Sequence, residues 1–131
     1  VIEFRDCMEK SLILAARDLD VPAESGGLVP GAIGRCGQFA FIGAGVRSWV
    51  SHGGVFVNVS VPHDALRVVR WKQDAGAVTS LSALRLKPTA MPTVRECLVR
   101  RLAEVLGYGD YQLYTGHPLL KRTRQKIYVF N

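Results

Sequence analysis

Residues 38–58 read QFAFIGAGVRSWVSHGGVFVN, and this stretch decides the fold because it carries two apolar runs around a short polar centre. Residues 38–43 and 54–61 are apolar runs of the length and composition typical of buried strands. Residues 46–51 (VRSWVS) are predicted to continue the strand pairing through a bend. The stretch therefore predicts two paired strands.

A helix is predicted on the N-terminal side of these strands. Apolar residues recur there at steps of four, four, three and four, which places them on one helical face. They are Phe4, Met8, Leu12, Ala15 and Leu19. Val21 and Pro22 are expected to end the helix, because proline lacks the helical N–H. Residues 24–31 (ESGGLVPG) are predicted to form a loop, since glycine and proline break regular structure.

A second helix is predicted to begin at Thr93. Thr93 and Glu96 match a capping box, in which the two side chains satisfy the first free N–H groups of a helix. Gly107 suits the end of the helix. The apolar stripe of this helix comprises Val94, Cys97, Leu98, Leu102, Val105 and Leu106. Because Cys97 falls within this stripe, it is interpreted as a buried structural thiol.

The remaining segments give weaker indications. Residues 62–64 are predicted to form a turn, and residues 65–71 (ALRVVRW) form a short mixed segment. Residues 77–86 (AVTSLSALRL) fit either a strand or the start of a helix. Residues 121–131 (KRTRQKIYVFN) are a basic run followed by a strand-like apolar tetrad.

Composition limits the classes of protein that this chain can represent. It has 131 residues, 48% of them hydrophobic and 21% charged, as expected of one globular domain rather than a disordered tail. No apolar run approaches the ~18 residues that a membrane span needs, and the charged N-terminus is unlike a signal peptide. A start at Val1 without Met suggests a processed or truncated chain. We expect an intracellular protein that does not engage a membrane.

The cysteines argue against a metal or disulfide framework. Cys7, Cys36 and Cys97 are widely spaced, odd in number and without a C-x-x-C pair. A zinc site or a disulfide framework is not expected from such spacing, and a reducing compartment fits better. No metal and no cofactor are predicted.

The charge is unevenly distributed along the chain. Residues 1–65 hold five Lys and Arg against seven Asp and Glu, whereas residues 66–131 hold twelve against four. Such asymmetry favours an acidic partner, RNA or protein, for the second half. A solvated basic face explains the same composition, and the sequence leaves both interpretations open.

Short motifs within the central stretch leave the function open. Gly43 and Gly45 could begin a G-x-G-x-x-G phosphate loop, but Ser48 occupies the third glycine position and no Walker pattern follows. A Cys36–His52 dyad would require the two strands to pair with a suitable offset, and no third orienting group is evident.

A longer pattern gives a resemblance. The stretch from Gln38 to Asn58 resembles, without a gap, the segment K-I-A-x-I-G-V-x-V-x-R-W-V-T-x-H-G-x-A-L-N of the lipoate-biosynthetic octanoyltransferases. These enzymes belong to the biotin/lipoate protein ligase superfamily. The matching residues are Ala40, Ile42, Gly43, Val46, Trp49, Val50, Gly54 and Asn58. Weaker similarities on both sides include GLVPGAIG, which resembles P-G-V-W-V, and DAGAVTSLS, which resembles G-V-T-S-L-S.

The resemblance implies an α/β (α+β) fold, in which a mixed, largely antiparallel sheet carries packed helices. Residues 1–131 would form one octanoyltransferase-like domain. The family's R-G-G-x-x-T-Y-H-G-P-G-Q segment, which supplies much of the acyl pocket, would lie upstream of Val1, so the domain is expected to be N-terminally incomplete. The substrate-pocket positions implied by the resemblance are Phe41, Ile42, Gly43, Gly54, Val55 and Phe56.

The catalytic positions of the family are not retained. The family lysine, which lowers the pKa of the acyl-accepting cysteine, corresponds to Gln38. The cysteine itself corresponds to Trp71 or Lys72, depending on the direction of counting. The family histidine corresponds to Gly53, with His52 one place earlier and on the opposite strand face.

These departures predict a catalytically degenerate relative that acts as a scaffold or binding subunit. A ribonucleoprotein of the mitochondrial ribosome type is one such assembly, and a mitochondrial location is favoured over a cytoplasmic one. Residues that could contact nucleic acid are Arg70, Trp71, Lys72, Lys121, Arg122, Arg124 and Lys126.

Two alternatives stay open. The first is an active octanoyl or lipoyl transferase completed by residues or a chain outside this sequence. Cys36 is then the only candidate nucleophile near position 38, because it lies two residues away along the same strand. The second is an acyl-binding protein without chemistry.

Overall fold

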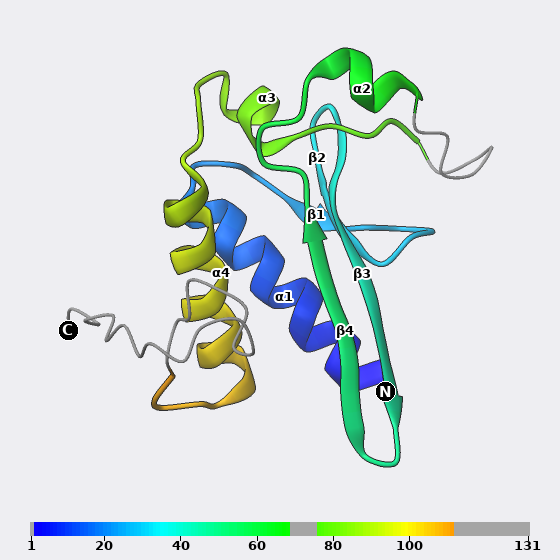
Figure 1. Cartoon of the computed structure of the whole chain (residues 1–131), viewed down its shortest axis with the longest axis vertical. Coiled ribbons are helices and arrows are strands. Elements are labelled where there is room, and N and C mark those ends of the chain that lie inside the picture. The colour runs from blue at the N-terminus through cyan, green and yellow to red at the C-terminus, as the bar shows by residue number, and fades with distance from the viewer. Residues whose placement is uncertain (1, 69–75, 112–131) are drawn as a thin grey trace, which may run out of the picture.

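The computed structural model describes residues 2–68 and 76–111 of the chain. These residues form eight helices and strands, which are labelled in Figure 1. In chain order they are α1 (Ile2–Asp18), β1 (Glu24–Ser25), β2 (Gly31–Gly34), β3 (Gly37–Arg47), β4 (Val50–Val57), α2 (His63–Val68), α3 (Leu81–Arg85) and α4 (Met91–Leu106).

The four strands form one antiparallel sheet in the order β1-β2-β3-β4. Gln38 of β3 adds an isolated parallel bridge to Val78, so the main-chain pairing is mixed but largely antiparallel. The long helices α1 and α4 pack side by side against one face of this sheet (Figure 1). The predicted α+β class, with helices packed on a largely antiparallel sheet, is confirmed.

The hydrophobic core lies between these helices and the sheet. Its most enclosed side chains come from both layers and are at most 2% exposed. They are Leu12, Ala15 and Ala16 of α1, Val21, Ala32 of β2, Phe39 and Ala40 of β3, Leu81 of α3 and Val94 of α4. The predicted N-terminal amphipathic helix is therefore the one that closes the core, and it ends at Asp18, just before the left-handed Asp20 (φ +61°).

The central stretch forms a long hairpin that extends past the N-terminal end of α1 (Figure 1). The two predicted strands are present, but residues 46–51 do not form a separate bend between them. Residues 46 and 47 belong to β3, residues 50 and 51 belong to β4, and only Ser48 and Trp49 form the turn. Both have positive φ, of 50° and 64°, as two-residue hairpin turns require. β4 ends at Val57 rather than at residue 61.

The predicted capping box at Thr93 is wrong. α4 begins at Met91, after an extended Ala90, and no side chain caps it. Pro92 lies in the first helical turn, where its missing N–H would have no partner in any case, and this explains the earlier start. The predicted end at Gly107 is confirmed, with φ +76°.

Three other segments also differ from expectation. The loop predicted for residues 24–31 contains β1 and the first residue of β2, because Glu24 and Ser25 pair with Ile33 and Ala32, and Gly31 pairs with Phe41. The turn predicted for residues 62–64 gives way to α2. Residues 77–86 contain both alternatives, a bridge at Val78 and then α3, whose first turn is capped by Ser80.

Among the described residues, no helix combines the length and hydrophobicity that a membrane crossing requires.

Candidate functional site

Gln38 occupies the centre of the candidate site and is buried, with 2% of its surface exposed. Its side-chain Nε2 donates one hydrogen bond to the Val29 carbonyl at 3.1 Å and another to the Ala40 carbonyl at 3.0 Å. Its main chain pairs with Ala77 and Thr79. The amide at this position therefore ties the β1–β2 loop to β3.

The β1–β2 loop is held by a second polar contact, from α1. The Glu9 carboxylate accepts a hydrogen bond from Ser25 Oγ at 2.6 Å and another from the Gly31 N–H at 3.0 Å. The Gly26 N–H donates to the Gly31 carbonyl at 2.9 Å and closes the loop. Sequence reasoning missed Glu9, because its contacts reach Ser25 and Gly31, 16 and 22 residues further along the chain, and no local motif indicates them.

The six implied pocket residues are brought together as three directly opposed pairs: Phe41 with Phe56, Ile42 with Val55, and Gly43 with Gly54. Opposed residues of an antiparallel pair share a face, and successive pairs alternate between faces. Ile42 and Val55 pack against the core beneath the helices. The Phe41–Phe56 and Gly43–Gly54 pairs consequently lie on the other face, which we call the outer face of the hairpin.

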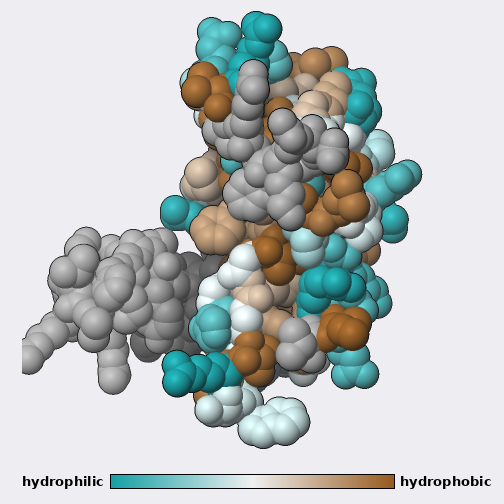
Figure 2. Space-filling view, turned by 90° about the vertical axis from the view of Figure 1, so that its right-hand side faces the viewer, coloured by the Kyte–Doolittle hydropathy of each residue, from teal (hydrophilic) through white to brown (hydrophobic). Residues whose placement is uncertain are grey.

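Ring side chains of β4 lie across glycines of β3 on this outer face. A methyl group at Gly43 would stand 2.8 Å from Cε2 of Phe56, and one at Gly45 would stand 2.7 Å from Cε1 of His52. The two glycines thus make room for the two rings. Phe56 is 64% exposed, and Figure 2 shows hydrophobic and hydrophilic side chains interspersed on the side of the molecule where the hairpin lies.

Gly53 cannot be replaced by a histidine without moving the backbone. Its φ is +83°, and a Cβ there would lie 2.0 Å from the Gly43 carbonyl oxygen. His52 pairs instead with Gly45, one residue before the position at which the family histidine was expected. The imidazole of His52 is therefore placed over Gly45 of β3.

Cys36 lies exposed in the two-residue turn between β2 and β3. The neighbouring Arg35 directs its guanidinium to the Leu84 carbonyl at 3.4 Å. Cys97, in contrast, is buried, and burial raises the pKa of its thiol. Cys36, near position 38, is thus exposed, Cys7 is half-buried, and the expected burial of Cys97 is confirmed.

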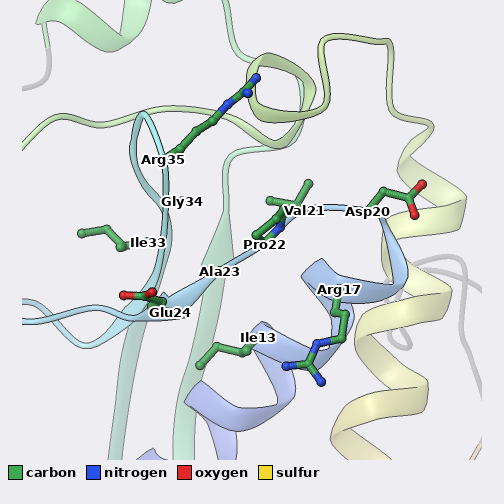
Figure 3. A pocket seen from close by; sticks show the side chains of 10 residues that line it. All are labelled: Ile13, Arg17, Asp20, Val21, Pro22, Ala23, Glu24, Ile33, Gly34 and Arg35. Carbon is green, nitrogen blue, oxygen red and sulfur yellow. The ribbon is translucent and has the colours of Figure 1, made fainter.

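A hollow of about 600 Å³ lies beside this turn, between the end of α1 and β2. Figure 3 shows an apolar floor with Ile13 and Val21, and charged side chains that diverge: Arg35 points toward α3 and Arg17 lies along α1. None of the six implied pocket residues lines it. A second hollow of about 140 Å³ is lined by Ile42, beneath the N-terminal end of α1.

The nucleic-acid candidates fall outside the described residues. They are Arg70, Trp71, Lys72, Lys121, Arg122, Arg124 and Lys126. This set includes both counterparts of the family cysteine, Trp71 and Lys72. Within residues 2–68 and 76–111, no cluster of three or more His, Cys, Asp or Glu side chains could hold a metal ion.

The fold has a counterpart among solved structures. No family model and no curated protein matches this chain, but three solved chains do. One is protein Ta0514 of T. acidophilum, described as a lipoate protein ligase and solved with lipoic acid bound, with a TM-score of 0.60 and 17% identity. The match covers 81% of this chain and 46% of that one, so this chain spans less than half the length of that protein. The two share a fold over this part.

Proposed function

We propose that this chain is a non-catalytic relative of the octanoyltransferases and serves as a scaffold or binding subunit. The single observation that carries the proposal is the state of Gln38. At the position where the family has its lysine, the amide is buried and donates to two main-chain carbonyls. A neutral amide cannot accept a proton from a thiol or lower its pKa, whereas acyl transfer to cysteine needs the thiolate.

The partner of this subunit is proposed to be acidic. The second half of the chain carries twelve basic and four acidic residues, which favours RNA or an acidic protein surface. A ribonucleoprotein assembly such as a mitochondrial ribosome would offer both. Residues 1–131 would act there as one domain, which a further chain could complete.

Incubation with octanoyl acyl-carrier protein, followed by intact-mass measurement, tests the loss of activity. We expect no octanoyl adduct on the chain, while an active octanoyltransferase treated in parallel becomes acylated. A stable adduct of one octanoyl group would overturn the proposal. If Cys36→Ser then abolished the adduct, the exposed thiol of the β2–β3 turn would be the nucleophile of an active transferase.

A functional rescue separates an incomplete enzyme from a degenerate one. The same incubation is repeated with the purified N-terminal half of an octanoyltransferase, which contains the R-G-G-x-x-T-Y-H-G-P-G-Q segment. We expect the chain to stay unmodified, because the added half supplies a pocket but not the missing lysine and cysteine. Acylation of the chain only in the mixture would support the alternative of a transferase completed by another polypeptide.

A further inference from the structure

The outer face of the hairpin carries two rings at a defined spacing. Phe56 lies over Gly43 and His52 lies over Gly45, and these glycines are two residues apart on one strand. Two residues of an antiparallel strand span ~6.8 Å. This is about twice the ~3.4 Å rise between neighbouring stacked bases. The two glycines beneath the rings are therefore separated by about the distance that one stacked base requires between its two neighbours.

The space between the two rings is open. Gly54 lies midway between them on β4, and no atom lies within 4 Å of the point where a Cβ on Gly54 would stand. The Phe56 side chain is 64% exposed, and His52 is exposed as well. A ligand can thus reach the gap from solvent without displacing a side chain.

The charge around this gap favours an anion. Arg47 follows Gly45 by two residues and so shares the outer face. No Asp or Glu occurs in residues 25–63, which include the whole hairpin. At the tip of the hairpin, Trp49 is 99% exposed and offers a further ring. Aromatic side chains combined with a basic group and no carboxylate are the features of surfaces that bind single-stranded nucleic acid.

We propose that the outer face of the hairpin binds single-stranded RNA by holding one base between Phe56 and His52. Arg47 contacts the phosphate backbone beside that base. The inference rests on the proposed binding role and names its partner, but it uses residues of the hairpin rather than the basic segments of the second half. A base is favoured over a basic peptide side chain because two exposed rings flank Gly54 on β4 and the hairpin carries no carboxylate.

Fluorescence anisotropy with the full chain tests this site. The probes are labelled oligouridylate and oligoadenylate of about 12 nucleotides, a length within single-strand site sizes, and an abasic oligomer of equal length and charge. We expect Phe56→Ala and His52→Ala each to weaken binding at least about fivefold. Gly54→Val fills the gap at a position with an ordinary backbone and free space, and is expected to weaken binding to a similar degree.

Two controls isolate base stacking. Met91→Ala removes an exposed apolar side chain from α4, on the opposite side of the sheet, and is expected to leave the affinity unchanged. The abasic oligomer should bind more weakly than oligouridylate and should not respond to the three hairpin variants.

Three results would overturn the proposal: no RNA binding by the full chain, equal affinity of wild type and all three variants, or equal affinity for the abasic oligomer. None of these bears on the acylation experiment, so the RNA site can fail while the non-catalytic assignment stands. Binding of an acidic protein with no binding of RNA would likewise exclude this site.

Discussion

Asp18 at the end of α1 accepts two hydrogen bonds of 2.7 Å from the Arg101 guanidinium on α4, although 83 residues separate them in the chain. Arg100 adds a contact to the same carboxylate at 3.2 Å. A bidentate contact of this kind fixes both the distance and the orientation of its partners. The two helices that cover the sheet are therefore joined at their surface as well as through the core.

The first prediction concerns the pH dependence of this contact. Hydrogen bonding from Arg101 lowers the pKa of Asp18, so its folded pKa lies below the ordinary value of about 3.9. The stabilisation is then present above that value and is lost as the pH falls through the folded pKa. We expect Asp18→Asn to lower the free energy of unfolding at pH 7. The difference from wild type should shrink as the pH falls below about 4.

Urea unfolding of both proteins between pH 7 and pH 2.5 provides the measurement. Asp20→Asn is the matched control, since Asp20 makes only a 3.8 Å contact with Lys87 and is 82% exposed. A difference between wild type and Asp18→Asn that stayed constant down to the lowest pH would show that the ion pair contributes nothing.

The second prediction concerns the direction of the Gln38 hydrogen bonds. Gln38→Glu keeps the size of the side chain but presents oxygen to the Val29 and Ala40 carbonyls. We expect a loss of at least about 2 kcal/mol at pH 7, because a buried carboxylate without a donor is poorly tolerated. Burial raises the pKa of such a glutamate, so the loss should diminish as the pH falls toward about 5, where the protonated acid can donate.

Gln38→Leu is the comparison for this change. It removes the donor without adding a charge and is expected to cost about 1–3 kcal/mol with no dependence on pH. Thermal unfolding at pH 7 and pH 5 distinguishes the two variants. If Gln38→Glu and Gln38→Leu lost the same stability at both pH values, the hydrogen bonds of the Gln38 amide would contribute nothing to stability.

The third prediction compares two adjacent glycines of β4. Gly53→Ala places a Cβ 2.0 Å from the Gly43 carbonyl oxygen at a φ of +83°, and we expect it to cost about 1–3 kcal/mol or more. Gly54→Ala meets no atom within 4 Å and should change stability by less than about 0.5 kcal/mol. Denaturant midpoints at equal slope measure both, and similar midpoints would contradict the geometry of β4.

The fourth prediction compares leucines of the two packed helices. Leu12 of α1 is 2% exposed, so Leu12→Ala is expected to cost about 2–5 kcal/mol. Leu98 and Leu102 of α4 are only partly buried, and their replacement by alanine should cost less than that range. Equilibrium unfolding of the three variants ranks them. If Leu102→Ala lowered the free energy of unfolding more than Leu12→Ala, the core would have to lie closer to Leu102 than the structure places it.

The sequence predicted the two long helices and the hairpin strands because these elements have strong local patterns. Periodic apolar residues gave α1, and the Gly107 signal gave the end of α4. The start of α4 was misplaced because Thr93 and Glu96 imitate a capping box, while the proline at position 92 determines the first turn. The position of the hairpin turn was not predicted, because Ser48 and Trp49 are not residues that favour positive φ.

The candidate site was less accessible to sequence reasoning because it depends on contacts between distant segments. The resemblance could mark Phe41 and Phe56 as pocket positions. It could not show that Ile42 and Val55 face the helices while their neighbours in the strands face away. The Glu9 carboxylate accepts a hydrogen bond from the Gly31 N–H and so holds the loop near Gln38, although Glu9 lies 22 residues before Gly31 in the chain. No local pattern encodes such a contact, since it arises only when α1 packs beside the sheet.

The last prediction separates electrostatic attraction from base stacking in RNA binding. Replacing Lys121, Arg122, Arg124 and Lys126 with glutamine removes four positive charges outside the described residues. If each contacts a phosphate, the slope of log affinity against log salt should fall by up to about 3, at ~0.7 per contact with a single strand. Trp71→Ala should weaken binding with little change in slope, because stacking releases no counterion. Filter binding at several salt concentrations measures both quantities. A steep salt slope that survives the four substitutions would assign the attraction to other basic residues, Arg47 among them, and an affinity that ignores salt altogether would exclude RNA as the acidic partner.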